Sequence, residues 1–386
     1  MKGRKLLMIP GPVEFEPAVM RAMGSPTTSH IAPSFIEEFG QALERMRQVF
    51  LCAKGQPFIV AGSGTLAMDL AGANLAEPGD AALVVNTGYF GDRFGALLER
   101  YGARVDHVRA AVGDAPALEQ VETALKAKPY KLVTITQVDT STGVLADVAG
   151  VARLAQAAGA LVIVDGVCSV GGEELRMDDW GIDLALTASQ KALATPPGLA
   201  LVMAGPRAMA AWRARKTPVS NYYADWNNWL PIMEAYEARK PSYFGTPAVN
   251  LVYALNVSLG QILAEGMEAR FARHRKLSAA CKAAVEALGL GQLPVAGKRA
   301  NTMTAPLYPA GVDASVLAKI NAAGAILAGG LHPAVRNSYF RIGHMGPNNA
   351  ADILGTIAAI ETGLAQAGYV FEPGAGLAAA QRVFLK

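Results

Sequence analysis

An acid and an amine stand 26 positions apart in this chain, each beside a short apolar segment. Asp165 ends the run Leu161–Asp165, and Lys191 follows the apolar segment Ile182–Leu186 in a small polar turn. From residue 184 to residue 206 Lys191 is the only charged residue, so we expect its pKa to be lowered. Such an amine forms Schiff bases with aldehydes, and a carboxylate keeps a pyridine nitrogen protonated. The pair predicts a site for pyridoxal 5'-phosphate.

A phosphate cradle is predicted at Ala61–Thr65, which opens a small-residue helix that reaches about Ala76. Glycine lets the backbone approach closely, the first helical N–H groups attract an anion, and the Ser63 and Thr65 hydroxyls add donors. The segment lacks the Gly-Lys-Ser/Thr of a Walker loop and the Gly-x-Gly-x-x-Gly of dinucleotide sites. An ordinary capped helix after a glycine turn is the alternative, so the motif gains weight only beside the Asp165–Lys191 pair.

Two further loops follow predicted strands and carry side chains suited to a planar ring. Asn86–Arg93 places two aromatic residues, one of them Phe90, between glycines, and an aromatic face can stack on a ring. Asp139–Gly143 holds small hydroxyls, among them Thr140, that can bond a ring substituent. Ordinary loop packing and turn capping remain the alternatives for these two segments.

Arg341 lies in an otherwise apolar strand pattern, Ser338–Gly346. A guanidinium in that setting needs an anion, and it suits the two oxygens of a substrate carboxylate. A structural ion pair is the alternative explanation.

These residues must be positioned by alternating strands and helices, which predict an α/β fold with a mostly parallel central sheet. Ligands of such sheets collect at the carboxyl ends of the strands, where Asp165 and Lys191 are expected. The expected strands are Ala82–Asn86, Arg104–Val108, Lys131–Thr136, Leu161–Asp165, Ile182–Leu186 and Leu199–Ala204. The expected helices between them are Asp92–Tyr101, Leu118–Ala127 and Val148–Ala158.

The pattern changes in the second half of the chain. Lys216–Tyr253 has poor periodicity, and one long helix is expected from about Val249 to Leu288. Further short strands and a helix near Ala350–Ala367 follow. We therefore predict a large cofactor-binding domain with an N-terminal arm over residues 1–262 and a smaller C-terminal α+β domain over residues 263–386.

Composition narrows the class of protein. The 386 residues carry a net charge of +3 with both signs dispersed, so nucleic acid is not an expected partner. Three cysteines do not make a disulfide framework, and no apolar run approaches a membrane span. The apolar stretch at the N-terminus is too short for a signal peptide, and the C-terminus is not Ser-Lys-Leu. We expect a cytoplasmic enzyme without a metal site or a membrane contact.

Taken together, the motifs resemble class V aminotransferases of pyridoxal phosphate fold type I, in particular the alanine–glyoxylate and serine–pyruvate group. The resemblance runs from Pro10 to the region around Arg341. The motifs that carry it are Pro10–Pro12, Ser63–Thr65, Ser141–Leu145, Asp165–Ser169, Gly181–Asp183, Ser189–Leu193 and Pro196–Gly198.

The resemblance implies a role for each matching residue. Lys191 would carry the cofactor and move the proton, Asp165 would pair with the ring nitrogen, and Arg341 would bind the substrate α-carboxylate. Thr140 would contact the ring hydroxyl, Val167 and Phe90 would cover the ring faces, and the phosphate would bind Ser63, Gly64, Thr65 and Gln190. Tyr243 and Thr246 match positions that reach the phosphate of a partner subunit, which implies a homodimer with shared sites.

The resemblance also implies the reaction, transamination between a small amino acid, alanine or serine, and glyoxylate or another small 2-oxo acid. A ureidoglycine- or phosphonate-directed aminotransferase is one alternative. A cysteine desulfurase is another, although Cys52, Cys168 and Cys281 all lie in segments that do not suit a mobile nucleophile. A non-catalytic protein of the same fold is the third.

Overall fold

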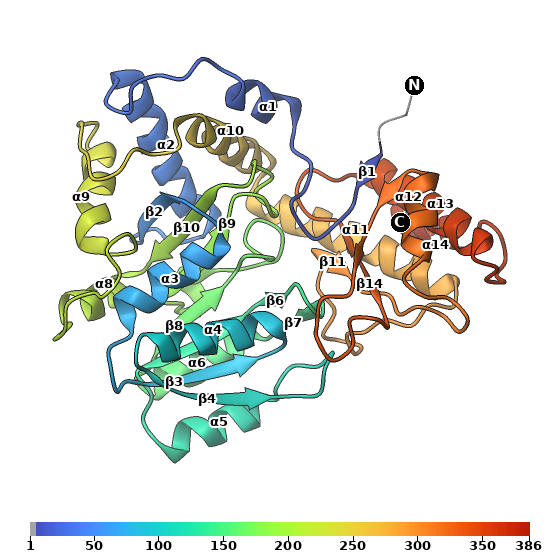
Figure 1. The fold of residues 1–386 in the computed structure, drawn as a ribbon, viewed down its shortest axis with the longest axis horizontal. Helices are drawn as coiled ribbons and strands as arrows, with labels where there is room; N and C mark the ends of the chain where they lie inside the picture. Colours follow the sequence, from blue (N-terminus) through green and yellow to red (C-terminus); the bar gives the residue numbers. More distant parts are fainter. Residues whose placement is uncertain (1–4) are drawn as a thin grey trace.

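The computed structural model describes residues 5–386, and its centre is a seven-stranded sheet (Figure 1). Six strands are mutually parallel, and the remaining one, β10, runs antiparallel to both of its neighbours. In spatial order the strands are β2 (Gln56–Ala61), β10 (Leu199–Ala204), β9 (Leu184–Ala188), β8 (Leu161–Asp165), β5 (Leu132–Thr136), β3 (Ala81–Asn86) and β4 (Arg104–Arg109).

The central strands are buried along their whole length because helices cover both faces of the sheet (Figure 1). Fully covered strands explain why these segments are nearly continuous apolar runs. The helices of this large layered unit are α2 (Pro33–Val49), α3 (Gly64–Leu75), α4 (Tyr89–Arg100), α5 (Leu118–Ala127), α6 (Val148–Ala157), α7 (Met177–Trp180), α8 (Pro206–Arg213), α9 (Trp226–Glu237) and α10 (Val249–Glu265).

A second hydrophobic cluster lies beyond helix α11 (Met267–Ala287), which passes between the two parts of the molecule (Figure 1). It contains side chains of α11 itself, of α12 (Val316–Ala323), α13 (Ala350–Gln366) and α14 (Ala375–Phe384), and of strand β14 (Phe340–Gly343). Strand β14 pairs with β11 (Met303–Thr304) and β13 (Ala328–Gly329) in a three-stranded sheet. The domain boundary near residue 262 stays a prediction, and Phe271 of α11 still belongs to the large cluster.

The N-terminal arm starts in the smaller part and then crosses to the larger one. Strand β1 (Leu6–Leu7) pairs with β12 (Ala325–Ile326), and the chain continues through Pro10–Pro12 to α1 (Pro17–Met23), which packs on α10. The small hairpin β6 (Val138–Asp139) and β7 (Val144–Leu145) extends from the end of β5. Both segments reach the carboxyl ends of the central strands.

The strands expected from the sequence are present, with ends shifted by at most two residues. The expected long helix is wrong as a single element, since it breaks at Gly266, whose φ of +85° is a left-handed conformation. Helix α9 lies inside the segment with poor periodicity, because its Trp and Tyr side chains bury on several sides and Pro231 interrupts the pattern. Strand β2 was not expected, because Pro57, its second residue, is unusual inside a strand. The proline is tolerated because β2 is an edge strand, paired only with β10 in the central sheet.

Candidate active site

Asp165 and Lys191 come together at one edge of the sheet, as expected from their places after adjacent strands. Asp165 is the last residue of β8, and Lys191 lies in the turn between β9 and β10. Both line one cavity of about 190 Å³ together with the cradle at Ser63–Thr65. Their juxtaposition follows from strand order, because β8 and β9 are parallel neighbours.

The Lys191 amine is buried and has no carboxylate within ion-pair distance among residues 5–386. Burial lowers the pKa of Lys191, and the nearby Arg341 charge lowers it as well. The ammonium nitrogen donates a hydrogen bond to the carbonyl oxygen of Pro10 in the N-terminal arm. A Cβ at Gly11 would overlap the lysine side chain, and Gly11 has a φ of +98°, so glycine is needed there.

Asp165 is almost completely buried, and burial raises its pKa to about 6. The charge of Asp139 raises this pKa further, whereas the Val167 N–H and the Lys191 charge lower it. Asp165 Oδ1 accepts a hydrogen bond of 3.0 Å from Val167 N. The carboxylate therefore has acceptor capacity left for an N–H group inside the cavity.

The phosphate end of the cavity is the start of helix α3. Ser63 is the residue before the helix, and its side chain does not cap the first helical N–H groups. The Gln190 side-chain oxygen is buried without a hydrogen-bond partner in the described chain. An added Cβ at Gly64 would lie 3.0 Å from Val167 Cγ2, so the helix start packs closely on the cavity wall. Uncapped N–H groups suit an anion, and the NH2 group of the Gln190 side chain is a further possible donor to it.

The walls between these groups carry side chains that suit a planar ring. Phe90 from the start of α4, Thr140 after β6 and Val167 after β8 all line the cavity. The residues predicted to hold the cofactor that line it are Ser63, Gly64, Thr65, Phe90, Thr140, Asp165, Val167, Gln190 and Lys191. The residues present thus fit pyridoxal phosphate at both its phosphate and its ring.

Arg341 lies beside this cavity on β14 rather than in its wall. Its Nε donates to Gly329 O at 2.8 Å, and its Nη1 donates to Thr140 O at 3.1 Å. Across the described residues no acid lies within 4.0 Å of it, so the structural ion pair considered above is absent. Burial lowers the pKa of Arg341, as expected for a guanidinium that lacks a counter-charge.

Tyr243 and Thr246 do not line the cavity of their own chain. Both are exposed, and Tyr243 packs on His30 with ring centroids 5.1 Å apart. Their predicted contact with a partner subunit's phosphate therefore stays a prediction.

Some residues of the site were not predicted from the sequence. Thr136, Val138, Cys168 and Met68 also line the cavity. Arg93 donates from α4 to Thr65 Oγ1 at 3.0 Å, which brings a cation to the phosphate end. Only the placement of Arg93 three residues after Phe90, one helical turn away, could have indicated this.

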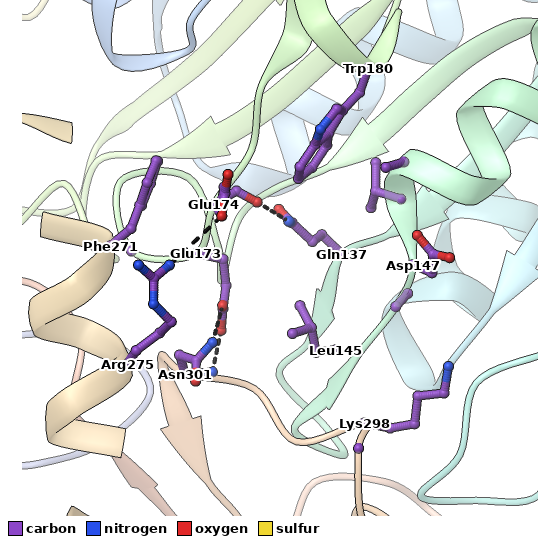
Figure 2. A pocket seen from close by; sticks show the side chains of 15 residues that line it. Gln137, Leu145, Asp147, Glu173, Glu174, Trp180, Phe271, Arg275, Lys298 and Asn301 are labelled. Atoms are coloured by element: carbon purple, nitrogen blue, oxygen red, sulfur yellow. Dashed lines mark hydrogen bonds and ion pairs between the residues drawn. The ribbon is translucent and has the colours of Figure 1, made fainter. Parts of the chain in front are cut away.

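A larger cavity of about 360 Å³ lies between the large unit, helix α11 and the loop 297–301 (Figure 2). It holds none of the predicted site residues. Its buried carboxylate, Glu173, accepts hydrogen bonds from Asn301 and Thr302. Its cations are Arg275 and Lys298, which stand at the walls and not in the interior (Figure 2).

The family model described as aminotransferase class-V matches residues 18–352 of this chain. The chain belongs to the class V aminotransferases. It is 40% identical over 359 residues to alanine–glyoxylate aminotransferase 1 of Saccharomyces cerevisiae, covering 89% of this chain and 93% of that protein. It is 34% identical over 386 residues to the serine–glyoxylate aminotransferase of Arabidopsis thaliana, covering 98% of this chain and 94% of that protein.

Among solved structures, this class V chain is similar to the ureidoglycine–glyoxylate aminotransferase of Bacillus subtilis. The TM-score is 0.93 at 29% identity, with 100% of this chain and 99% of that chain covered. The predicted α/β fold and the predicted aminotransferase class are therefore confirmed.

All three cysteines of this aminotransferase are buried. Burial raises the pKa of Cys52 to about 12, that of Cys281 to about 11, and that of Cys168 as well. None is therefore an exposed, easily ionised nucleophile, which argues against the desulfurase alternative. Within residues 5–386 no helix is long and apolar enough to cross a membrane.

Proposed function

We propose that this aminotransferase moves the amino group of alanine or serine to glyoxylate, with pyridoxal phosphate as its cofactor. The observation that carries the proposal is a buried lysine without an acidic partner, facing the same cavity as a buried carboxylate. When bound, the cofactor supplies an aldehyde for the amino group and a ring that accepts electrons. The relatives named for alanine–glyoxylate and serine–glyoxylate transfer support the choice of substrates.

Arg341 and Asp165 hold the substrate and the cofactor, and Lys191 transfers the proton. Arg341 offers a half-buried guanidinium without an acidic partner for the substrate carboxylate and orients the Cα–H bond. The Lys191 amine has a lowered pKa, so its neutral form is available to take the proton from Cα and to return it at the other reacting carbon. Asp165 holds the proton on the ring nitrogen, because its free oxygen accepts from an N–H group.

The N-terminal arm orients the lysine. The Pro10 carbonyl accepts from the Lys191 amine, and Gly11 lets the backbone lie directly against the side chain. We extend the proposal to a homodimer, in which the exposed Tyr243 and Thr246 reach the phosphate of the partner subunit. Their exposure beside the aromatic cluster of Tyr222 and Phe244 supports that contact.

A half-reaction screen tests the choice of donor. The cofactor-loaded enzyme is mixed with alanine, serine, glycine and ureidoglycine, and the loss of the visible band of the bound cofactor is followed. Glyoxylate and pyruvate are then compared as acceptors. We expect alanine or serine to react fastest and glyoxylate to restore the band.

Other outcomes of the screen select the alternatives. Reaction with ureidoglycine alone would support the activity named for the Bacillus subtilis neighbour. That neighbour is 29% identical to this chain, whereas the yeast relative is 40% identical. Release of sulfide from cysteine would support a desulfurase. Bound cofactor that reacts with no donor would support a non-catalytic protein.

A further inference from the structure

Asp139 is a buried carboxylate that the mechanism above leaves without a role. Its side chain is completely buried at the end of β6, and over the described range 5–386 it forms no ion pair. A buried charge without a cation needs several hydrogen bonds. Asp139 has them: Oδ2 accepts from Phe90 N at 3.0 Å, while Oδ1 accepts from Ser141 N at 2.9 Å and from Ser141 Oγ at 2.6 Å.

These bonds place Asp139 at the start of helix α4. The residue before this helix is Gly88, which has no side chain to cap the first N–H groups. Asp139 caps Phe90 N instead, and Ser141 Oγ accepts from Tyr89 N at 3.1 Å. A negative charge at a helix N-terminus is favourable, so the helix compensates the buried carboxylate.

The fit between the loop and the helix is close. A Cβ at Gly88 would lie 2.7 Å from both Asp139 Cγ and Ser141 Oγ, so no larger residue can stand there without movement. Phe90, whose ring lines the cofactor cavity, thus has its backbone held by a carboxylate 49 positions away.

The same turn also holds the substrate side of the cavity. The Thr140 carbonyl accepts from Arg341 Nη1 at 3.1 Å. The Ser141 carbonyl accepts from the hydroxyl of Tyr339, two residues before Arg341 on the same strand segment. One three-residue turn therefore contacts both the ring-stacking residue and the carboxylate-binding residue.

We propose that Asp139 is a positioning residue that fixes Phe90 against the cofactor ring and, through the turn 139–141, sets Arg341 at the substrate carboxylate. This inference rests on the proposed function, since it assigns the ring to Phe90 and the carboxylate to Arg341. The charge of Asp139 also raises the pKa of Asp165, which shows that the two carboxylates lie close enough to interact.

The test compares Asp139→Asn with Asp183→Asn. Asp183 is another buried carboxylate on this sheet, accepts from Val162 N at 2.8 Å and pairs with Arg207, but does not line the cavity. An asparagine at 139 has one acceptor oxygen and cannot serve both Phe90 and Ser141. We expect about tenfold weaker binding of pyridoxal phosphate and about a tenfold higher KM for the amino donor. The visible circular dichroism of the bound cofactor should also change.

Asp183→Asn should lower the melting temperature and leave cofactor affinity, circular dichroism and KM as in the wild type. A double-mutant cycle of Asp139→Asn with Phe90→Ala should be non-additive in cofactor affinity, because both changes disturb the same contact. If Asp139→Asn leaves affinity, dichroism and KM unchanged, or if the cycle is additive, the inference is wrong.

Two further measurements keep the result interpretable. If Asp139→Asn does not fold, Ser141→Ala takes its place as the test. Ser141→Ala should weaken cofactor binding and raise KM, but by less, because the hydrogen bond between Asp139 and Phe90 stays. Unchanged cofactor affinity and KM in Ser141→Ala would overturn the inference. Cofactor affinity and dichroism do not depend on turnover. Wild-type protein that binds cofactor but transfers no amino group would contradict the proposed function, while the Asp139 variant would still decide this inference.

Discussion

Two of the cavities of this protein, the candidate active site and the cavity of Figure 2, each contain a buried carboxylate, and the two carboxylates differ in their hydrogen bonds. Glu173, in the larger cavity, accepts from the Asn301 backbone, from Asn301 Nδ2 at 2.8 Å and from Thr302 N at 3.1 Å. Asp165, in the smaller cavity, accepts one backbone hydrogen bond, from Val167. The first carboxylate ties two segments together, whereas the second keeps capacity for a ligand.

The lysines of the two cavities also differ in their contacts. Lys191 donates to a backbone carbonyl and has a pKa lowered by burial, whereas Lys298, which is partly exposed like Lys191, lies at a wall of the larger cavity (Figure 2). Cavity size therefore does not identify the active site here. Buried ionisable groups whose hydrogen-bonding capacity is incompletely used identify it, because they are costly unless a ligand compensates them.

The largest effect is expected from the substitution of Lys191. Lys191→Ala should lower kcat by about 10⁴-fold or more, because the variant loses the proton-transferring amine. It should also lose the visible band of the lysine-bound cofactor. Steady-state kinetics and absorbance of the cofactor-loaded protein measure both effects.

Lys298→Ala is the matched control, since it removes a lysine from the larger cavity. We expect its kcat and absorbance to equal those of the wild type. Near-wild-type turnover by Lys191→Ala, or a comparable loss in Lys298→Ala, would remove the contrast between the two cavities.

A second experiment should distinguish the two carboxylates, because Asp165 is expected to affect activity and Glu173 to affect stability. Asp165→Asn should bind the cofactor and lower kcat by about 10³-fold, because a neutral amide stabilises a ring N–H⁺ much less than a carboxylate does. Glu173→Gln should instead cost about 1–3 kcal/mol of stability, since charge-assisted hydrogen bonds to Asn301 and Thr302 are weakened. The kcat of its folded fraction should stay within about twofold of wild type.

Denaturation curves and kinetics on the same preparations measure these two effects. A Glu173→Gln variant that is stable but inactive would show that Glu173 takes part in catalysis. Full activity in Asp165→Asn would show that Asp165 does not.

The last expected effect is on stability alone, and it concerns the pH dependence of the cofactor-free protein. Burial raises the folded-state pKa of Asp165 from 3.8 to about 6, so between these values the folded state binds the proton more tightly than the unfolded state. The free energy of unfolding should therefore fall as pH rises through about 6, with a contribution from Asp165 of about 3 kcal/mol at full ionisation.

The measurement is denaturant unfolding of cofactor-free wild type and Asp165→Asn from about pH 4 to pH 8. Other buried acids with raised pKa that are not coupled to Asp165, such as Glu173 and Asp183, contribute to both proteins and cancel in the difference. If the curves of unfolding free energy against pH are parallel for the two proteins, Asp165 has the same pKa folded and unfolded, and this prediction is wrong.

The sequence predicted the parallel strands well because each one is a short apolar run buried on both faces. It failed where tertiary contacts override the local pattern. The expected long helix breaks at Gly266, and α9 forms because Trp226, Trp229 and Tyr236 pack into the large core. Nothing in a 3.6-residue period indicates such packing on several sides.

The sequence by itself determined which groups carry the chemistry: a carboxylate at a strand end, a lysine isolated from other charges, and a glycine–hydroxyl helix start. Each is a local pattern, and the order of parallel strands is enough to bring Asp165 and Lys191 together. The tertiary structure alone decided that Pro10 orients Lys191 and that the turn at Asp139 joins Phe90 to Arg341. Those contacts connect residues 49 to 201 positions apart, and no local period encodes such distances.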